Sequence, residues 1–537
     1  MREPPASSGF GRFLQSGGTS ETVLHAAGIV AFGFLASRLL GLLRSVAIAH
    51  AFGTDPQLGA YWVAFRLPDL VFQVLAGATL SAAFIPTYSR MRLRNGEQAG
   101  WRLASDVLNL VSIATTVVAV LAFLLAPWIV PLLAPGLGQQ SDRSEELRTL
   151  AISLTRLMLI SPILFGVSGM LTGILNARQH FIAPALAPMI YNVSIILGAL
   201  LLAKPFGVYG LAIGVVVGSL GHLLVQVPAL RAVGMRWSLT LDIASAGVIE
   251  VARLMGPRVI GLAAAQLNFI IVLFFASFIS DAAISALTYA FLLAMLPVGI
   301  VGMAISTAVF PSMAQQAAAQ QMETLRDSVA RSLRLILFLS IPASLGLAVL
   351  AEPAVRLLFE RGAFDAKATA LVSTAVVWYA FAVFAHAGIE ILSRGFYAVA
   401  DTRTPVRMAV LAVVVNALLS ALLVGPLGVR GLAIATSVAA IVEFALLWRA
   451  LVDRLEGLGE SGVGRSALRT LAASAVMAEV VIVVLLLLRV GGVAGTSMGG
   501  ALLLTAVGGL AGLAAFGITA ALLRSEEIHE VLDRVGG

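Results

Sequence analysis

Long apolar runs alternate with short polar connectors along nearly the whole chain. Each run holds about 20 or more apolar residues, which is the length a helix needs to cross a bilayer. The pattern predicts an all-α polytopic membrane protein with about 14 transmembrane helices, and the longest runs are expected to tilt or to project beyond the bilayer. The predicted spans are 22–52, 57–89, 104–133, 147–177, 181–203, 207–232, 256–279, 282–315, 329–359, 368–398, 404–425, 428–452, 466–489 and 497–523.

The pattern also repeats. The segment GVYGLAIGVVVGS begins at Gly207 and the similar GVRGLAIATSVAA at Gly428, an offset of 221 residues (428 minus 207). A weaker match relates GATLSAAFIP at Gly77 to GMAISTAVFP at Gly302. A duplicated half with an even number of spans predicts two six-helix lobes, related by a pseudo-two-fold axis along the membrane normal. Two further helices follow the repeat.

Domain boundaries follow from the spans. The first 20 residues are rich in Pro, Gly and Ser and predict a disordered tail rather than a cleaved signal peptide, because the apolar run after them is about twice as long as a signal h-region. The predicted parts are a cytoplasmic tail 1–21, an N-lobe 22–233, a cytoplasmic connector 234–255, a C-lobe 256–454, a linker 455–465, two C-terminal helices 466–524 and a cytoplasmic tail 525–537.

Composition narrows the function classes. Hydrophobic residues make up 59% of the chain, charged residues 12%, and the mean hydropathy is +0.97. The net charge of +7 comes mainly from arginines in connectors, which predicts cytoplasmic connectors, both termini in the cytoplasm and no nucleic-acid partner. There is no cysteine. Walker A and HExxH motifs are also absent, so we expect no enzyme, no cofactor and no metal site.

Charged residues inside two apolar runs are the candidate site. Arg38 and Arg44 lie in the first run, and Arg66 and Asp69 flank Pro68 in the second. Charge at membrane depth costs several kcal/mol, so we expect these groups to face a shared polar cavity. On a helix Arg38 and Arg44 point about 120° apart, so we expect them to contact two parts of a large anion, such as a sugar diphosphate, rather than one small anion.

Less specific readings of the same residues stay open. In one alternative interpretation, Arg44 extends to the membrane interface and Arg38 forms an ion pair with Asp69. Arg66 and Asp69 form either a local ion pair or a substrate contact.

Several short sequence motifs occur in the order typical of one protein family. They are SRLLGLLR, AYWVAFRLPDL, SAAFIP, APWIVPLLAPG, GILNARQHFIAPALAPMIYN, GPRVIGLAAAQLN, FFASF and FYAVADTRTPV. The chain resembles the MurJ/MviN family of lipid II flippases, in the multidrug/oligosaccharidyl-lipid/polysaccharide exporter superfamily, from about Leu24 to Leu523. The resemblance implies a cationic central cavity for the diphosphate and the sugar-pentapeptide head. It also implies a hydrophobic groove at the last two helices for the lipid tail.

The family's site residues carry over incompletely. Its two arginines of the first helix fall on Arg38 and Arg44, and Arg66 matches a basic residue found in relatives. An acidic residue of the second helix falls on Gly59. Cavity arginines of the second and eighth helices fall on Phe72 and Leu292, so much of the usual positive charge is missing.

The residues of a sodium site found in some family members are also only partly matched in this sequence. Its asparagine and threonine resemble Asn416 and Thr436, but its two aspartates fall on Val272 and Ser420. Neutral ligands without a carboxylate offset little of the cost of dehydrating a sodium ion, so we expect a degenerate ion site.

The resemblance implies a flippase that moves lipid II from the cytoplasmic to the outer leaflet of a bacterial inner membrane by alternating access. Its partners are the lipid-linked oligosaccharide, membrane lipids and other cell-wall synthesis proteins. Three alternatives stay open: a flippase for another polyprenyl-diphosphate glycan of a capsule or exopolysaccharide, a cation-coupled multidrug antiporter, and a scaffold that does not transport. The first is favoured by the missing arginines at Phe72 and Leu292.

Overall fold

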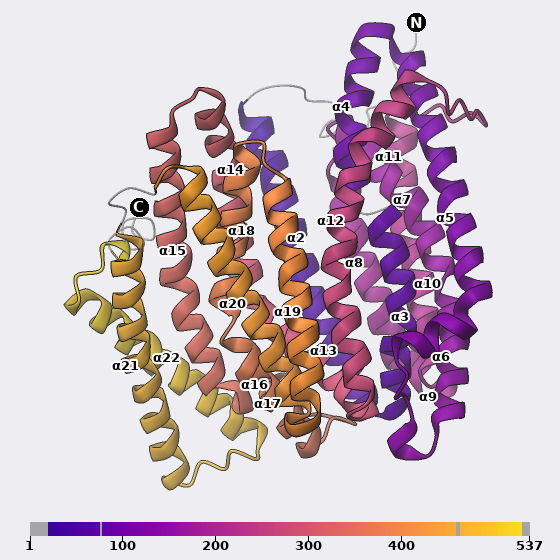
Figure 1. Cartoon of the computed structure of the whole chain (residues 1–537). Helices are drawn as coiled ribbons and strands as arrows, with labels where there is room; N and C mark the ends of the chain where they lie inside the picture. The colour runs from indigo at the N-terminus through magenta and orange to yellow at the C-terminus, as the bar shows by residue number, and fades with distance from the viewer. Residues whose placement is uncertain (1–19, 76–77, 458–461, 529–537) are drawn as a thin grey trace, which may run out of the picture. The chain divides into compact units, whose positions relative to one another are not determined.

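The protein is a helical membrane protein, seen in a computed structural model that describes residues 20–75, 78–457 and 462–528. Side chains are described in these ranges except at 20–32, 34, 78–82, 141 and 257–265. Every regular element within the described ranges is a helix (Figure 1). The predicted all-α class is therefore confirmed.

The helices of the first part of the chain are α2 (Ser20–Phe52), α3 (Pro56–Leu75), α4 (Ala78–Asn95), α5 (Glu97–Leu133), η1 (Gln139–Ser141), α6 (Ser144–Met158), α7 (Ile160–Ala177), α8 (Ile182–Leu197), η2 (Gly198–Leu202), α9 (Ala203–Phe206), α10 (Tyr209–Leu224), α11 (Val227–Ala232) and α12 (Ala246–Ser277). Those of the second part are α13 (Asp281–Pro297), η3 (Val298–Gly302), α14 (Met303–Ala318), α15 (Met322–Val349), α16 (Ala351–Phe359), α17 (Ala366–Ala380), α18 (Val383–Ala398), α19 (Arg403–Leu427), α20 (Val429–Arg454), α21 (Val463–Val490) and α22 (Met498–Leu522).

The predicted count of 14 spans is not confirmed. Among the described residues, 11 helices are long and apolar enough to cross a membrane, or up to 12 if the bent pair α17 and α18 is one span. The remaining predicted spans fall on α3 with α4 and on α12. In both regions part of the span lies outside the described residues or side chains.

The chain divides into two compact units. Unit 1 comprises 1–51, 60–132 and 148–263, and unit 2 comprises 52–59, 133–147 and 264–537. A core of α4, α5, α7 and α12 side chains, including Phe84, Trp101 and Ile174, lies in unit 1. In unit 2 a second core joins α14, α15, α18 and α20. The predicted domain boundaries remain predictions.

A matching hairpin occurs in each unit where the sequence repeats. Gly207 and Gly428 both have positive φ, 55° and 53°, a conformation that glycine adopts without a steric penalty. Three residues later, a Cβ on Gly210 would lie 2.7 Å from the Leu202 carbonyl, and one on Gly431 would lie 2.3 Å from the Leu423 carbonyl. The repeat in the sequence is thus a repeat in backbone structure. Gly77, where the weaker match begins, lies outside the described residues.

Several of the long apolar runs are broken rather than continuous. The run 329–359 forms α15 and α16, and the run 368–398 forms α17 and α18, which meet at an angle of 45°. The π-helical turns η2 and η3 interrupt two other runs. A break of this kind changes the direction of a helix without leaving the membrane.

The two predicted C-terminal helices are α21 and α22, and they pack against α15. Phe338 of α15, Met477 of α21 and Phe516 of α22 lie in one buried cluster, with the Phe338 and Phe516 rings 5.1 Å apart. Ser497 starts α22, because its hydroxyl accepts a hydrogen bond from the Gly500 amide at 3.0 Å.

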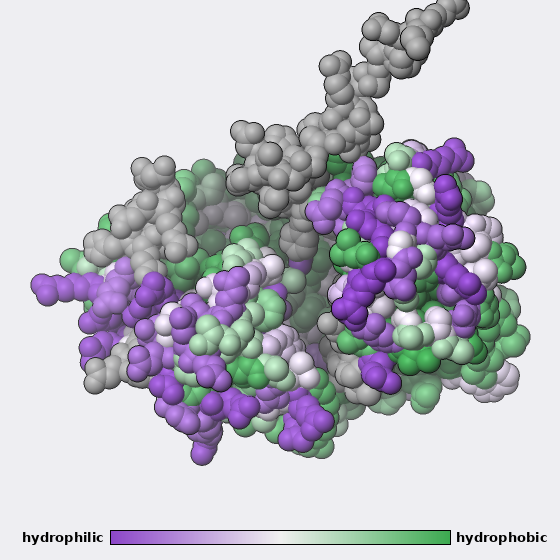
Figure 2. Space-filling model, turned by 90° about the horizontal axis from the view of Figure 1, so that it is seen from above, coloured by the Kyte–Doolittle hydropathy of each residue, from purple (hydrophilic) through white to green (hydrophobic). Residues whose placement is uncertain are grey.

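Hydrophilic residues gather at one end of the helices in each unit, and hydrophobic residues cover the flanks (Figure 2). In unit 1, Arg90 of α4 and Glu250 of α12 form an ion pair at 2.7 Å. Such a division of surface polarity is the one a bilayer imposes.

Candidate substrate-binding site

A short polar ladder lies on one face of α3. Arg66 Nη1 lies 3.4 Å from Asp69 Oδ2, and the two side chains are only 21% and 20% exposed. Gln73, one turn further along, donates from Nε2 to Asp69 at 3.2 Å. Pro68 lies within the same helix, where it removes one backbone donor. The local ion pair that the spacing allowed is therefore present, and Arg66 is its cation.

Arg44 of α2 approaches this ladder from a second helix. It interacts electrostatically with Asp69, with Tyr61 of α3 and with Tyr191 of α8. Among the described residues Arg44 forms neither an ion pair nor a hydrogen bond. We call Arg44, Tyr61, Arg66, Asp69, Gln73 and Tyr191 the charged cluster; all six residues lie in unit 1.

Arg38 lies on α2 six residues before Arg44, and its side chain is exposed. Asp69 forms its ion pair with Arg66. The role of Arg38 in substrate binding stays a prediction.

Two departures from the family pattern have physical reasons in the structure. Phe72 packs on Phe165 with ring centres 4.7 Å apart, and Phe165 packs in turn on Tyr191. At Gly59 a Cβ would lie 2.7 Å from the Asp281 carbonyl oxygen. An acidic side chain at Gly59 would therefore push α3 away from the start of α13. Leu292, the third departure, lies half-buried in α13.

At the predicted degenerate ion site the side chains hydrogen-bond to one another. Asn416, which is fully buried in α19, donates from Nδ2 to Asn268 Oδ1 at 2.5 Å and accepts from Ser420 Oγ at 3.2 Å. Thr436 donates to the Leu432 carbonyl of its own helix at 3.0 Å. We call Asn268, Asn416 and Ser420 the amide cluster. Within this cluster Asn416 is both a donor and an acceptor, and Val272 adds no polar group.

The two clusters differ in what they can bind. Two guanidinium groups and one carboxylate give the charged cluster an excess of positive charge, and arginine suits the oxygens of a phosphate or diphosphate. The amide cluster has no charge to offset the dehydration of a cation. No group of three or more His, Asp or Glu side chains in the described part of the chain is placed to hold a metal ion.

Sequence reasoning missed four residues of these clusters. Gln73 lies four residues after Asp69, a spacing that puts the two side chains on one helix face. Tyr61 precedes Arg66 in the word AYWVAFRLPDL, and Tyr191 stands beside Asn192 in MIYN. Asn268 ends the word GLAAAQLN. Only for Gln73 did the sequence carry a usable signal, since the others meet their partners through tertiary packing.

Two of the sequence motifs that carry the resemblance have structural roles, and the first of them contains Arg178. Arg178 of NARQHF stacks on the Trp101 ring at 4.5 Å, donates to the Tyr88 hydroxyl at 2.9 Å and pairs with both carboxylate oxygens of Glu97. Burial lowers the pKa of Arg178, but the hydrogen bonds to Glu97 and Tyr88 outweigh it and raise the pKa. Arg178 therefore ties α7 to α4 and α5.

Asp401 of ADTRTP caps the start of α19. Its carboxylate accepts from the Arg403 and Thr404 amides, both at 3.0 Å, and from the Thr404 hydroxyl at 2.8 Å. Partial burial raises the pKa of Asp401, but the hydrogen bonds from Thr404 and Arg403 outweigh it and lower the pKa below its ordinary value. This cap fixes the first turn of the helix that carries Asn416.

Comparison with known proteins gives one consistent answer. The model of the family described as lipid II flippase MurJ matches residues 48–498. A Burkholderia cenocepacia protein named lipid II flippase MurJ is 32% identical over 441 residues, which cover 80% of this chain and 84% of that protein. A Rhizobium tropici protein named probable lipid II flippase MurJ is 31% identical over 459 residues, covering 83% and 84%.

Solved structures share the fold. One is a lipid II flippase MurJ in an inward closed conformation, with a TM-score of 0.76 and 24% identity, covering 92% of this chain and 99% of that one. Another is an inward-facing multidrug resistance MATE family transporter, with a TM-score of 0.65 and 15% identity, covering 79% and 96%.

Proposed function

Because the chain belongs to the lipid II flippase MurJ family, we propose that it moves lipid II from the cytoplasmic to the outer leaflet of a bacterial inner membrane. It does so by alternating access and acts as a transporter, not as an enzyme. Other cell-wall synthesis proteins supply and use its lipid-linked substrate. Both termini lie in the cytoplasm in this proposal.

The observation that carries the proposal is the state of Arg44. It lies in a membrane-spanning helix, close to Asp69, and yet forms no ion pair among the described residues. An arginine held in this way is costly unless it meets water or an anion. The diphosphate of lipid II supplies that anion, and the guanidinium fork binds two of its oxygens.

Arg66 has a second part in this proposal. Its charge is shared with Asp69 at 3.4 Å, a long contact for an ion pair. A diphosphate that approaches Arg66 competes with Asp69, whose carboxylate keeps the hydrogen bond from Gln73. Binding and release of the head group are then an exchange of partners on α3, while Arg38 extends the site along α2.

Complementation tests the proposal. In a bacterium depleted of its own lipid II flippase, the wild-type chain should restore growth, and Arg44→Ala at equal membrane expression should not. Arg94→Ala is the matched control, because Arg94 is an exposed arginine at the end of α4 in the same unit. Failure of the wild-type chain to restore growth at good expression would refute lipid II as substrate.

A second substrate class is favoured by Phe72 and Leu292, where the family resemblance places arginines. The Phe72 ring packs against Phe165, and it brings no positive charge to the site. A flippase for another polyprenyl-diphosphate glycan needs a differently shaped head-group site. Flipping assays in proteoliposomes with lipid II and with an exopolysaccharide lipid intermediate separate the two substrates.

Membrane orientation has its own test. The chain has no cysteine, so single cysteines can be introduced without background. A cysteine at Gln139 should react with an impermeant thiol reagent in intact cells, and one at Asn95 should not. The reverse pattern would invert the proposed orientation.

A further inference from the structure

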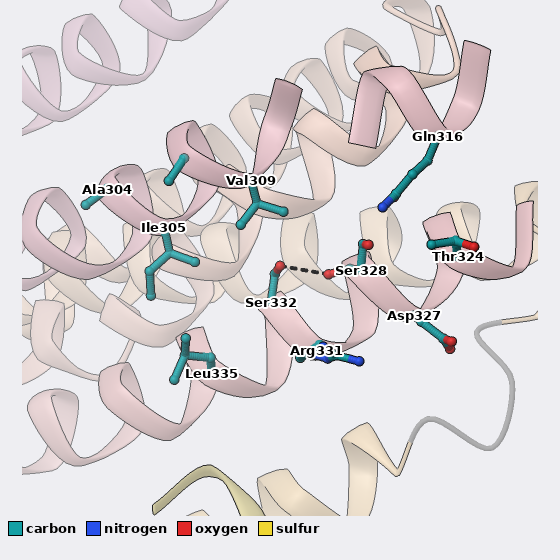
Figure 3. Close-up of a pocket in the computed structure, with 11 residues that line it drawn as sticks. Ala304, Ile305, Val309, Gln316, Thr324, Asp327, Ser328, Arg331, Ser332 and Leu335 are labelled. Carbon is teal, nitrogen blue, oxygen red and sulfur yellow. Dashed lines mark hydrogen bonds between the residues drawn. The ribbon is translucent and has the colours of Figure 1, made fainter. Parts of the chain in front are cut away.

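A groove runs between α14 and α15, the two helices joined by the short connector 319–321 in unit 2. Its volume is about 580 Å³, within the range of about 300–1,000 Å³ typical of small-molecule sites. Ile305, Val309 and Gln316 enter it from α14 (Figure 3). Asp327, Arg331 and Leu335 line it from α15.

Polarity changes along this groove. Ile305, Val309 and Leu335 form an apolar part, and Gln316, Asp327 and Arg331 lie at the end nearer the connector. On α15 the change falls between Arg331 and Leu335, where the charged start of the helix gives way to its apolar stretch. A groove with this gradient matches a lipid that keeps its head group at the membrane surface and its chains below.

The charges in the groove are open to a ligand. Asp327 and Arg331 are four residues apart, a spacing at which opposite charges on a helix commonly pair. Both are exposed, and neither forms an ion pair or a hydrogen bond with any residue the structure describes. They stand roughly 6 Å apart along the helix axis.

The other arginines of α15 behave differently. Arg326 pairs with Glu456 at 3.7 Å, and Arg334 pairs with Glu526 at 3.1 Å. Their charges are used within the protein. Asp327 and Arg331 are thus the pair of opposite charges that α15 presents to the groove.

We propose that this groove binds a phospholipid whose head group carries a phosphate beside a primary ammonium, as in phosphatidylethanolamine. Arg331 binds the phosphate, and Asp327 accepts hydrogen bonds from the ammonium. Ile305, Val309 and Leu335 contact the upper part of the acyl chains. The two opposite charges disfavour a purely anionic lipid, because such a lipid offers no cation to Asp327, which repels it.

Lipid binding to the purified full-length protein tests this proposal, with native mass spectrometry of protein in mixed micelles as readout. Phosphatidylethanolamine should bind about tenfold more tightly than phosphatidylglycerol, and also more tightly than phosphatidylcholine, whose methylated ammonium cannot donate to Asp327. Arg331→Gln and Asp327→Asn should each remove this preference. Asp327→Lys should reverse it in favour of phosphatidylglycerol.

Arg326→Gln is the matched control, because it removes a charge from the same helix outside the groove and should keep the preference. Circular dichroism and thermal unfolding check that each variant is folded. Equal binding of the three phospholipids by the wild-type protein would overturn the proposal, as would an unchanged preference in Arg331→Gln and Asp327→Asn. Stronger binding of a polyprenyl diphosphate that Arg331→Gln removes would instead assign the groove to the transported lipid.

Discussion

An asparagine beside the charged cluster of unit 1 and an asparagine within the amide cluster of unit 2 make different kinds of hydrogen bond. Asn192, next to Tyr191 of the charged cluster, donates to the backbone carbonyls of Pro188 at 3.0 Å and Ser37 at 3.4 Å. Asn416, which precedes the hairpin at Gly428 as Asn192 precedes the hairpin at Gly207, bonds to the side chains of Asn268 and Ser420. One asparagine fastens two helices beside a charged group. The other closes a neutral network.

The difference shows how duplicated halves can divide their work. A site that must bind and release an anion keeps a cation without a tight partner, at a cost in stability. A site that only holds helices together satisfies every polar group, since an unpaired buried group costs about 1–3 kcal/mol. We therefore expect changes in the charged cluster to alter transport and changes in the amide cluster to alter stability.

The largest effect is expected at Arg44. Arg44→Ala should lower the rate of lipid II flipping in proteoliposomes about tenfold or more, because a charge-assisted contact to the diphosphate is lost. The flipping rate of Arg44→Lys should lie between those of the wild type and Arg44→Ala, since lysine keeps the charge but not the forked geometry of the guanidinium group. Arg94→Ala should flip at the wild-type rate. Full activity of Arg44→Lys together with unfolding of Arg44→Ala would show that Arg44 is structural instead.

The next effect is on stability. Asn416→Ala leaves the Asn268 oxygen without a donor and the Ser420 hydroxyl without its acceptor, so it should destabilise the protein by about 1–3 kcal/mol. Chemical denaturation in detergent measures this loss, and flipping at a temperature below unfolding should change little. Thr436→Val, which removes a bond within one helix, should cost less. A large loss of flipping without loss of stability would contradict the division of work.

A smaller and pH-dependent effect is expected at Asp401. Its folded pKa lies below the ordinary value of 3.8, so its stabilisation is fully present above that value and is lost as the pH falls through the folded pKa. Asp401→Asn should cost about 1 kcal/mol or less at pH 7, and the difference from wild type should vanish at acidic pH below the folded pKa. A difference that stays constant with pH would show that the charge of Asp401 does not matter.

The smallest effect is expected from sodium. The resemblance places the two aspartates of a sodium site on Val272 and Ser420, so thermal stability should be the same in sodium, potassium and choline at matched ionic strength. Replacing both residues by aspartate should create a sodium-specific stabilisation. A sodium effect in the wild-type protein that Asn416→Ala removes would show that neutral ligands suffice.

Features of the fold that depend on residues within one helix or one hairpin could be predicted from the sequence. Apolar runs located the helices, and the repeat at Gly207 and Gly428 indicated a duplication that the structure shows as a matching hairpin at each glycine. The pair of Arg66 and Asp69 was also predictable, since both residues lie on α3. The breaks in the long runs were not predicted. Composition alone does not distinguish one long helix from two short ones joined within the membrane.

Contacts between helices were harder to predict. Nothing in the spacing links Arg44 to Tyr191, or Asn416 to Asn268, because these pairs form only when distant helices pack. Phe72 shows the same limit. The resemblance marked a missing arginine there, and only the structure explains the loss by the contact with Phe165.

The π-helical turn η3 has a consequence for the groove that lies beyond it. Such a turn holds one more residue than an α-helical turn, so every side chain after it is rotated by roughly 100° relative to an uninterrupted helix. Ser306, the first buried polar residue of α14, donates back to the Gly302 carbonyl at 2.5 Å and holds this arrangement. Deleting the exposed Ile300 would restore a regular helix and turn Ile305 and Val309 away from α15. The number of residues in the turn, independent of which residues they are, therefore decides which face of α14 meets the lipid.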